Sequence, residues 1–327
     1  MKLYPDTLLD KLGFDQIRKA TLELTQSVRS EEFMESLSPS SNPKRVQLLT
    51  EQTKEMLEVI ISPDPFPLGE FPEVREYLSA SKAEGSIIPL PAFVDILKVC
   101  SISRNVKKFF KARADQLPRL TKVSEGLIPT KELERSIKDK VTEYGDLRDD
   151  ASPELRAIRK KLNKRKNDLR TTINRSMKDA NKDGMASDEG PTIRNGRMVI
   201  PIQSEFKRKV QGFVHDVSAS GQTVYIEPVE ALNLNNEIRQ FEAEEQREIE
   251  RILRELTQHV RQNSEYIDQN ISCLAEIDVI YAKAKLTQKL DGEIPIISKT
   301  QYLSVKEAYN PILRLKNLNI KKKEDRE

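Results

Sequence analysis

The sequence is poor in the residues that fill a thick hydrophobic core. It has no Trp, only 6% aromatic residues, 37% hydrophobic residues and 11 Gly, whereas charged residues make up 33% of the 327 positions. A chain with so little apolar surface and so much charge favours long, thin helical structure. Its length predicts two or three structural units.

Cysteine and histidine are also scarce. Cys100 and Cys273 lie far apart without CxxC or Cys/His spacing, so we expect two reduced core thiols. The only histidines, His215 and His259, have no second metal-type ligand at helical spacing. His215 beside Asp216 resembles an acid–base pair, but adjacent strand residues point to opposite faces. The sequence therefore predicts no metal site and no catalytic residues.

Long apolar runs and nucleotide-binding motifs are missing as well. No window approaches the roughly 18 apolar residues of a membrane span, and the N-terminal segment lacks the apolar run of a signal peptide. These absences predict a cytoplasmic protein with no membrane partner. Residues 190–196 and 218–223 only faintly suggest phosphate loops, because neither has the GxxxxGK[ST] pattern. We expect no cofactor and no enzymatic activity in this chain.

Apolar residues recur at helical spacing through most of the first 125 residues. The pattern predicts helices within 3–37, broken near Gly13, and at about 43–61, 72–83 and 89–116. Asn42 can cap the helix at 43–61, and Pro43 suits its first turn. Residues 1–125 should therefore form an all-α core.

Two long charged passages are predicted to pair as antiparallel coiled-coil lever arms. Residues 126–182 should ascend, first in a helix that continues through Val141 and Tyr144, then in one that begins near Pro153. The second helix has a narrow apolar seam and is mostly basic elsewhere, while the descending helix at 231–263 is mostly acidic. The seam should supply the adhesion, and the unlike charges should set the pairing.

The segment 183–230 between these arms is rich in β-forming residues. Asn195-Gly196 between such residues is a strong signal for a type I′ hairpin, and a second hairpin is expected around Gly221. Pro228 has no amide hydrogen and should stop the strands. The four predicted strands cover 192–194, 197–202, 210–217 and 222–226. We expect a mainly α fold with a small β-hairpin clamp at the tip of the arms, unless the hairpins only cap the helices.

The last 64 residues contain first a helical pattern of apolar residues and then β-like stretches. Residues 264–293 have the apolar spacing of a helix that returns to the core. Residues 294–297 and 302–305 are β-like, and we interpret 294–327 as the start of a further domain that is cut off. The chain is accordingly interpreted as a fragment of a longer protein.

A group of basic residues near the predicted clamp is the candidate binding site. A polyanion would gain affinity there by releasing counterions, with no need to read bases. No predicted element offers several side chains to base edges, so we expect binding that does not depend on sequence. A solvated charged face is the alternative. The candidate residues are Lys178, Lys182, Arg194, Arg197, Lys207, Arg208 and Lys209.

Four stretches of the chain resemble the MutS superfamily, in particular its second bacterial paralogue branch, MutS-II. They are SPELRAIR at 152–159, TIRNGRMVIP at 192–201, GFVHDVSASGQTVYIEP at 212–228 and LNNEIR at 234–239. Weaker similarity at 7–110 and 276–284 extends the resemblance over most of the chain. It implies a helical core, a lever of long helices and a clamp at the tip of the lever. It also implies a downstream ATPase domain that uses ATP and Mg, a homodimer of the full-length protein, and in many members a C-terminal nuclease-like domain.

The resemblance implies two functions. One is binding of branched or duplex DNA and suppression of homologous recombination; the other is ATP-driven rescue of stalled or collided ribosomes. Mismatch recognition is not implied, because residue 1 begins directly in the helical core. DNA and rRNA are both rich in phosphate, so the charge of the clamp does not separate these functions. A helical spacer that only links other domains is the third interpretation.

Overall fold

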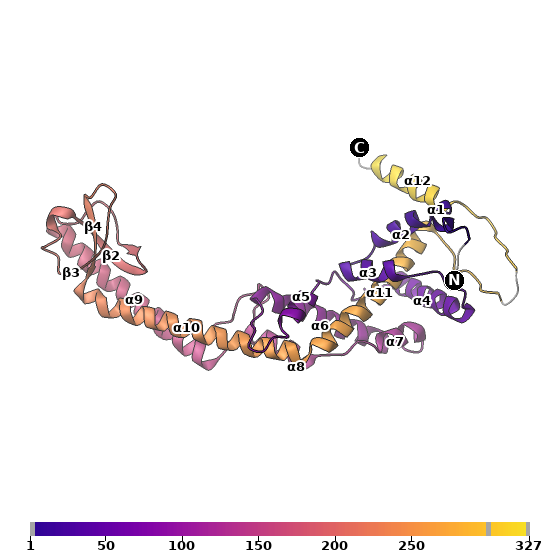
Figure 1. Cartoon of the computed structure of the whole chain (residues 1–327), viewed down its shortest axis with the longest axis horizontal. Helices are drawn as coiled ribbons and strands as arrows, with labels where there is room; N and C mark the ends of the chain where they lie inside the picture. Colours follow the sequence, from indigo (N-terminus) through magenta and orange to yellow (C-terminus); the bar gives the residue numbers. More distant parts are fainter. Residues whose placement is uncertain (1–3, 299–301, 325–327) are drawn as a thin grey trace. The chain divides into compact units, whose positions relative to one another are not determined.

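The computed structural model describes residues 4–298 and 302–324 (Figure 1). As predicted, the chain is mainly helical and carries a small antiparallel sheet. Its described residues divide into two compact units. Unit 1 comprises residues 4–138 and 143–145 and the described residues from 256 onward; unit 2 comprises 139–142 and 146–255.

The regular elements assigned to the described residues of unit 1 are all helices, and α11 (Ser264–Leu290) is its central element. This helix packs against α2, α3, α4 and α6, and it buries apolar residues on most of its circumference, as expected of an internal helix. The other helices assigned to this part are α1 (Leu8–Lys11), α2 (Phe14–Leu22), α3 (Val28–Ser36), α4 (Pro43–Ile61), α5 (Arg75–Ala80), α6 (Leu90–Lys111), α7 (Pro118–Ser124), α8 (Lys131–Lys140) and α12 (Pro311–Glu324).

The predicted helix boundaries at Gly13 and Asn42 are confirmed. Gly13 has φ 66° and separates α1 from α2, which explains why a residue without a Cβ stands there. The Asn42 side chain accepts hydrogen bonds from the amides of Lys44 and Arg45, at 3.0 and 3.3 Å, and Pro43 occupies the first turn of α4.

The predicted helix through Val141 and Tyr144 is wrong. Helix α8 ends at Lys140, and Val141 forms an isolated antiparallel bridge with Leu147. A tight turn closes this bridge at Gly145, which has φ 86°. The helical spacing of Val141 and Tyr144 gave a wrong prediction, because the turn buries Val141 with its bridge partner Leu147 and leaves Tyr144 85% exposed.

The strands predicted near the C-terminus are also wrong. Residues 292–298 and 302–310 have no regular structure, and α12 follows. Residues 299–301 lie outside the described part of the chain. A strand needs a neighbour that accepts its amide and carbonyl hydrogen bonds, and the described residues of unit 1 offer no strand. Asn310 caps α12, since its side-chain oxygen accepts from the Ile312 amide at 2.9 Å.

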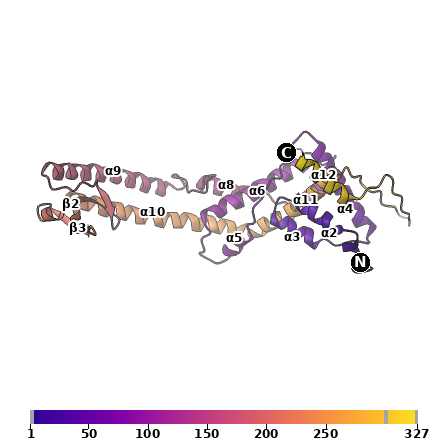
Figure 2. The same ribbon diagram turned by 90° about the horizontal axis from the view of Figure 1, so that it is seen from above.

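Two long helices form the body of unit 2. They are α9 (Pro153–Lys182) and α10 (Val229–Gln262), which lie side by side in both ribbon views (Figures 1 and 2). The ion pairs Arg159–Glu245, Arg165–Glu237 and Lys166–Glu242 join them at 2.7, 2.5 and 2.9 Å. Arg159, nearer the start of α9, meets Glu245, whereas Arg165 and Lys166, further along α9, meet residues with lower numbers on α10. The helices are therefore antiparallel, with unlike charges paired. A coiled-coil supercoil stays a prediction.

The sheet of unit 2 has the strand order β1-β2-β4-β3, with every neighbouring pair antiparallel. Its elements are β1 (Thr192–Arg194), β2 (Arg197–Gln203), a short 3-10 helix η1 (Ser204–Phe206), β3 (Gly212–Val217) and β4 (Thr223–Pro228). Both predicted hairpins form. Asn195 and Gly196 have φ 51° and 71°, the signs that a type I′ turn requires.

The two hairpins join because β2 pairs with β4, which places both strands in the middle of the sheet. One face of these strands then carries the apolar residues Ile200, Ile202, Val224 and Ile226. This face packs against the seam of α9 through Leu169, Ile173 and Met177. The sheet is thus a layer on the helix pair, held by the same seam that runs along α9.

The strand ends at Pro228 as predicted, but Glu227 and Pro228 themselves belong to β4, so the strand runs two residues past the predicted end at 226. Pro228 is the last residue of β4 and pairs with Gly212 of β3. Proline is tolerated at this terminal position, and the next amide, that of Val229, still donates to the Gln211 carbonyl at 3.2 Å. The close approach of β3 to β4 requires glycine at position 212, opposite Pro228. A Cβ on Gly212 would overlap the Glu227 carbonyl oxygen and come within 2.6 Å of Ile226 Cγ2.

Candidate nucleic-acid interface

The second face of the sheet carries a buried polar network around Glu227. The Glu227 side chain is 1% exposed. One carboxylate oxygen accepts from Arg197 Nη1 at 2.6 Å and from Asn235 Nδ2 at 2.8 Å, and His215 Nε2 lies 2.6 Å from the other. A buried carboxylate is costly unless it is paired and hydrogen-bonded, so Arg197 contributes to the stability of the sheet.

A β-bulge explains how His215 reaches this network. The register of β3 against β4 shifts between Val214 and Asp216, which leaves His215 as the additional residue. His215 then contacts Glu227, while Asp216 lies 3.3 Å from Arg194. The neighbours His215 and Asp216 thus have different partners, and at the bulge the regular alternation of faces on which the sequence argument relied does not hold. Sequence reasoning missed Glu227, because no local pattern links residues 12 apart.

Arg194 is held across the same face. Its guanidinium carbon lies 4.2 Å from the centre of the Tyr225 ring. The turn beside it is fixed by Asn195, whose side-chain amide donates to the His215 carbonyl at 3.0 Å. The β1–β2 hairpin therefore folds over β4 and reaches β3. Arg194 and Arg197 are both engaged in the sheet's own contacts.

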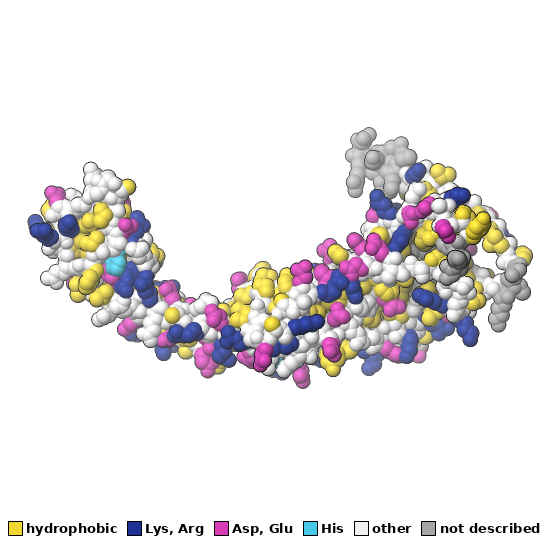
Figure 3. Space-filling model, viewed as in Figure 1, with side chains coloured by type: hydrophobic (Ala, Val, Ile, Leu, Met, Phe, Trp, Pro, Cys, Tyr) yellow, Lys and Arg dark blue, Asp and Glu magenta, His cyan; other side chains and the backbone are white. Residues whose placement is uncertain are grey.

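The other five predicted residues are exposed. Lys178 and Lys182 lie in the last turns of α9, and Lys207, Arg208 and Lys209 lie between η1 and β3. Among the residues that the structure describes, none of the five has an ion pair; the Lys209 ammonium lies 5.1 Å from the centre of the Phe206 ring. Figure 3 shows Lys and Arg side chains on the surface of the sheet-bearing end. These five cations are available to an external anion.

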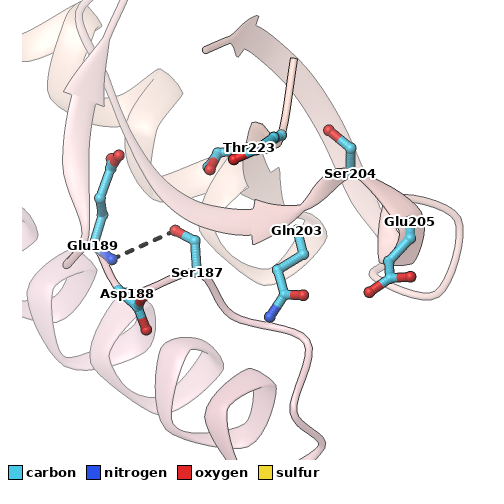
Figure 4. A pocket seen from close by; sticks show the side chains of 8 residues that line it. Ser187, Asp188, Glu189, Gln203, Ser204, Glu205 and Thr223 are labelled. Carbon is cyan, nitrogen blue, oxygen red and sulfur yellow. Dashed lines mark hydrogen bonds between the residues drawn. The ribbon is translucent and has the colours of Figure 1, made fainter. Parts of the chain in front are cut away.

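A polar hollow of about 590 Å³ lies at the same end of unit 2 (Figure 4). Its carboxylates are Asp188, Glu189 and Glu205, and no Lys or Arg lines it. The hollow is lined in full by Ser187, Asp188, Glu189, Gln203, Ser204, Glu205, Gln222 and Thr223. Nowhere in the described chain do three or more His, Cys, Asp or Glu residues lie where they could hold a metal ion. The negative charge of this hollow repels phosphate, so an anionic partner would approach elsewhere.

The chain is similar in sequence to several curated proteins that share one name. A protein of Geobacillus sp. (strain WCH70) called Endonuclease MutS2 is 33% identical over 309 residues, which cover 94% of this chain and 39% of the relative. Proteins of the same name from Halalkalibacterium halodurans and Pelotomaculum thermopropionicum are each 31% identical over 94% of this chain. This chain is a homologue of MutS2.

The resemblance to the MutS-II branch, predicted from the four sequence motifs, is confirmed by these MutS2 relatives. The chain spans about two fifths of the length of the MutS2 proteins that it matches. No family model matches the chain. None of the helices within residues 4–298 and 302–324 combines the length and the apolarity that a membrane crossing requires.

Proposed function

We propose that unit 2 binds nucleic acid through phosphate contacts and does not read sequence, with duplex or branched DNA as the target. The observation that carries this proposal is the set of exposed cations Lys178, Lys182, Lys207, Arg208 and Lys209, which lack ion-pair partners in the described residues. The relatives' name, Endonuclease MutS2, denotes action on nucleic acid and supports it. In the full-length protein this binding would be coupled to an ATPase and would serve the suppression of homologous recombination.

Phosphate contact is favoured over base reading because three of the cations stand on a connection and not on a helix or a strand. Lys207, Arg208 and Lys209 stand on a connection between η1 and β3, where long side chains can follow a backbone. Direct readout requires a helix or ribbon that enters a groove with several side chains aimed at base edges. Each neutralised phosphate releases counterions, so affinity should fall steeply with salt.

The test is a titration of the chain against duplex DNA, four-way-junction DNA and ribosomes in rising salt. Lys207→Ala, Arg208→Ala and Lys209→Ala together should weaken binding to all duplex sequences alike. The slope of log affinity against log salt should become shallower by up to ~0.9 for each duplex phosphate that the variant no longer neutralises, or ~2.7 for three.

A charge-matched control separates local binding from net charge. Lys44→Ala, Arg45→Ala and Lys54→Ala remove three exposed cations from α4 in unit 1, and like the first variant they take the formal charge from +3 to zero. This control should bind as the parent chain does. Unchanged binding in the 207–209 variant would refute the site, and binding to ribosomes alone would favour the ribosome-rescue function.

A further inference from the structure

Most basic residues of α9 fall into two groups; Lys161, whose ammonium lies 5.9 Å from the centre of the Phe241 ring, and Arg170 belong to neither. The first group flanks the apolar seam and pairs with acids of α10, as Arg159, Arg165 and Lys166 do. Arg159 and Arg165 also form ion pairs with acids nearer in sequence, at Asp149 and Asp168. This group is neutralised inside unit 2 and offers little charge to a partner.

The second group lies on the opposite side of the helix. At about 100° per residue, six cations fall within a sector of about 100° that faces away from the seam. No Asp or Glu shares this sector, whose other residues are small or polar, such as Ala157, Asn167 and Thr171. We call the six cations the α9 cation row: Arg156, Lys160, Lys164, Arg175, Lys178 and Lys182.

Every residue of the α9 cation row is exposed. Within the part of the chain that the structure describes, none of the six forms an ion pair, whereas the flanking cations of the same helix do. The ion pairs between α9 and α10 therefore leave most of the unpaired positive charge of α9 on the side that faces away from the seam. Lys178 and Lys182 belong to both the row and the site proposed above, so the row continues that site along the helix.

We propose that the α9 cation row binds the sugar-phosphate backbone of duplex DNA, and this inference rests on the proposed function. From Arg156 to Lys182 the helix rises by about 39 Å, at ~1.5 Å per residue. A duplex covers that length in about 11 base pairs, at ~3.4 Å each, and is straight on this scale because its persistence length is ~150 base pairs.

The composition of the sector selects a duplex over a single strand. Proteins that hold single strands stack bases on aromatic side chains. The sector from Arg156 to Lys182 contains no aromatic residue. Asn167, which stands in the gap between the two halves of the row, can donate a hydrogen bond to a phosphate oxygen through its side-chain amide, whereas the Thr171 hydroxyl already donates to the Asn167 carbonyl at 3.0 Å.

The test uses the row residues farthest from the sheet. In the complete 327-residue chain, Arg156→Ala, Lys160→Ala and Lys164→Ala should make the salt slope for duplex DNA shallower by up to ~2.7, the value for three phosphates that are no longer neutralised. Alanine favours helix, so circular dichroism should be unchanged. A second variant with Gln at the same three positions keeps the side chains long and should show the same change in slope.

The charge-matched variant of Lys44, Arg45 and Lys54 is the control, and single-stranded DNA and duplex RNA are the comparison ligands. If the 207–209 variant weakens duplex binding and both row variants do not, the row is refuted and the proposed function stands. If the parent chain binds no duplex, both fail. An equal weakening in the control, or a weakening confined to single strands or RNA, also overturns the assignment to duplex DNA.

Discussion

Arg197→Ala should destabilise the sheet of unit 2 and leave the exposed cations in place. Arg197 was selected from the sequence as a binding residue, but its guanidinium contacts Glu227 and Asn236, each at 2.6 Å. Its side chain is only 16% exposed. Removal of Arg197 would leave a buried carboxylate with two of its three partners, His215 and Asn235.

The expected cost follows from this geometry. Removal of one member of a buried ion pair typically costs ~3–5 kcal/mol. His215 and Asn235 still bond to Glu227, and Arg197 is partly solvated, so we expect ~2–4 kcal/mol. Adding Glu227→Gln removes the unpaired charge and should recover ~1–2 kcal/mol, because the amide needs less solvation than the carboxylate.

Hydrogen exchange of peptides from β2 and β4 measures this effect locally. A destabilisation of ~2–4 kcal/mol corresponds to exchange that is roughly 30 to 700 times faster where local opening controls the rate. Arg208→Ala, at an exposed position, is the control and should leave exchange unchanged. If Arg197→Ala leaves exchange unchanged but weakens DNA binding, Arg197 binds DNA directly and its structural role is wrong.

Two further outcomes are expected. Gly212→Ala should open the β3–β4 pair, since the added Cβ would overlap the Glu227 carbonyl oxygen. Proteolysis should then cut this hairpin faster. Gly190→Ala is the control and should cause no change, because no atom lies within 4 Å of its Cβ. Burial raises the pKa of the Cys100 thiol to about 11 and of the Cys273 thiol to about 12, from 9.0. At pH 8, below both values, the thiolate fractions of Cys100 and Cys273 are roughly 100-fold and 1,000-fold lower than for a thiol with a pKa of 9.0. Alkylation should therefore be slow in the native protein and become fast in urea. Fast alkylation of the native protein would contradict the burial of these thiols.

Local chemistry was sufficient to predict several elements. Asn42 and Pro43 define a helix start through a side-chain cap and a fixed φ, and Asn195-Gly196 defines a type I′ turn through positive φ. Both signals act within four residues, so they depend little on the rest of the chain. The seam of α9 was predicted for a similar reason, because apolar side chains at helical spacing need a partner.

The sheet and its polar network were decided by tertiary structure. The β2–β4 pairing joins strands that are separated in sequence, and the bulge at His215 directs its side chain to Glu227. Neither feature has a local signature. The Arg197 guanidinium is thereby placed in the sheet, although in the sequence it looked as available as Arg208.

Apolar spacing and turn signals were enough to predict a mainly helical chain with two hairpins, and the sequence carried the motifs of the MutS-II branch. It also contained the period that places Arg156, Lys160 and Lys164 on one face of α9. Which cations remain available depends on the packing of the folded chain, because an ion pair forms only with the neighbour that packing brings within about 4 Å. Arg159 and Lys160 are adjacent in the chain, yet packing pairs Arg159 with Glu245 and leaves Lys160 facing outward.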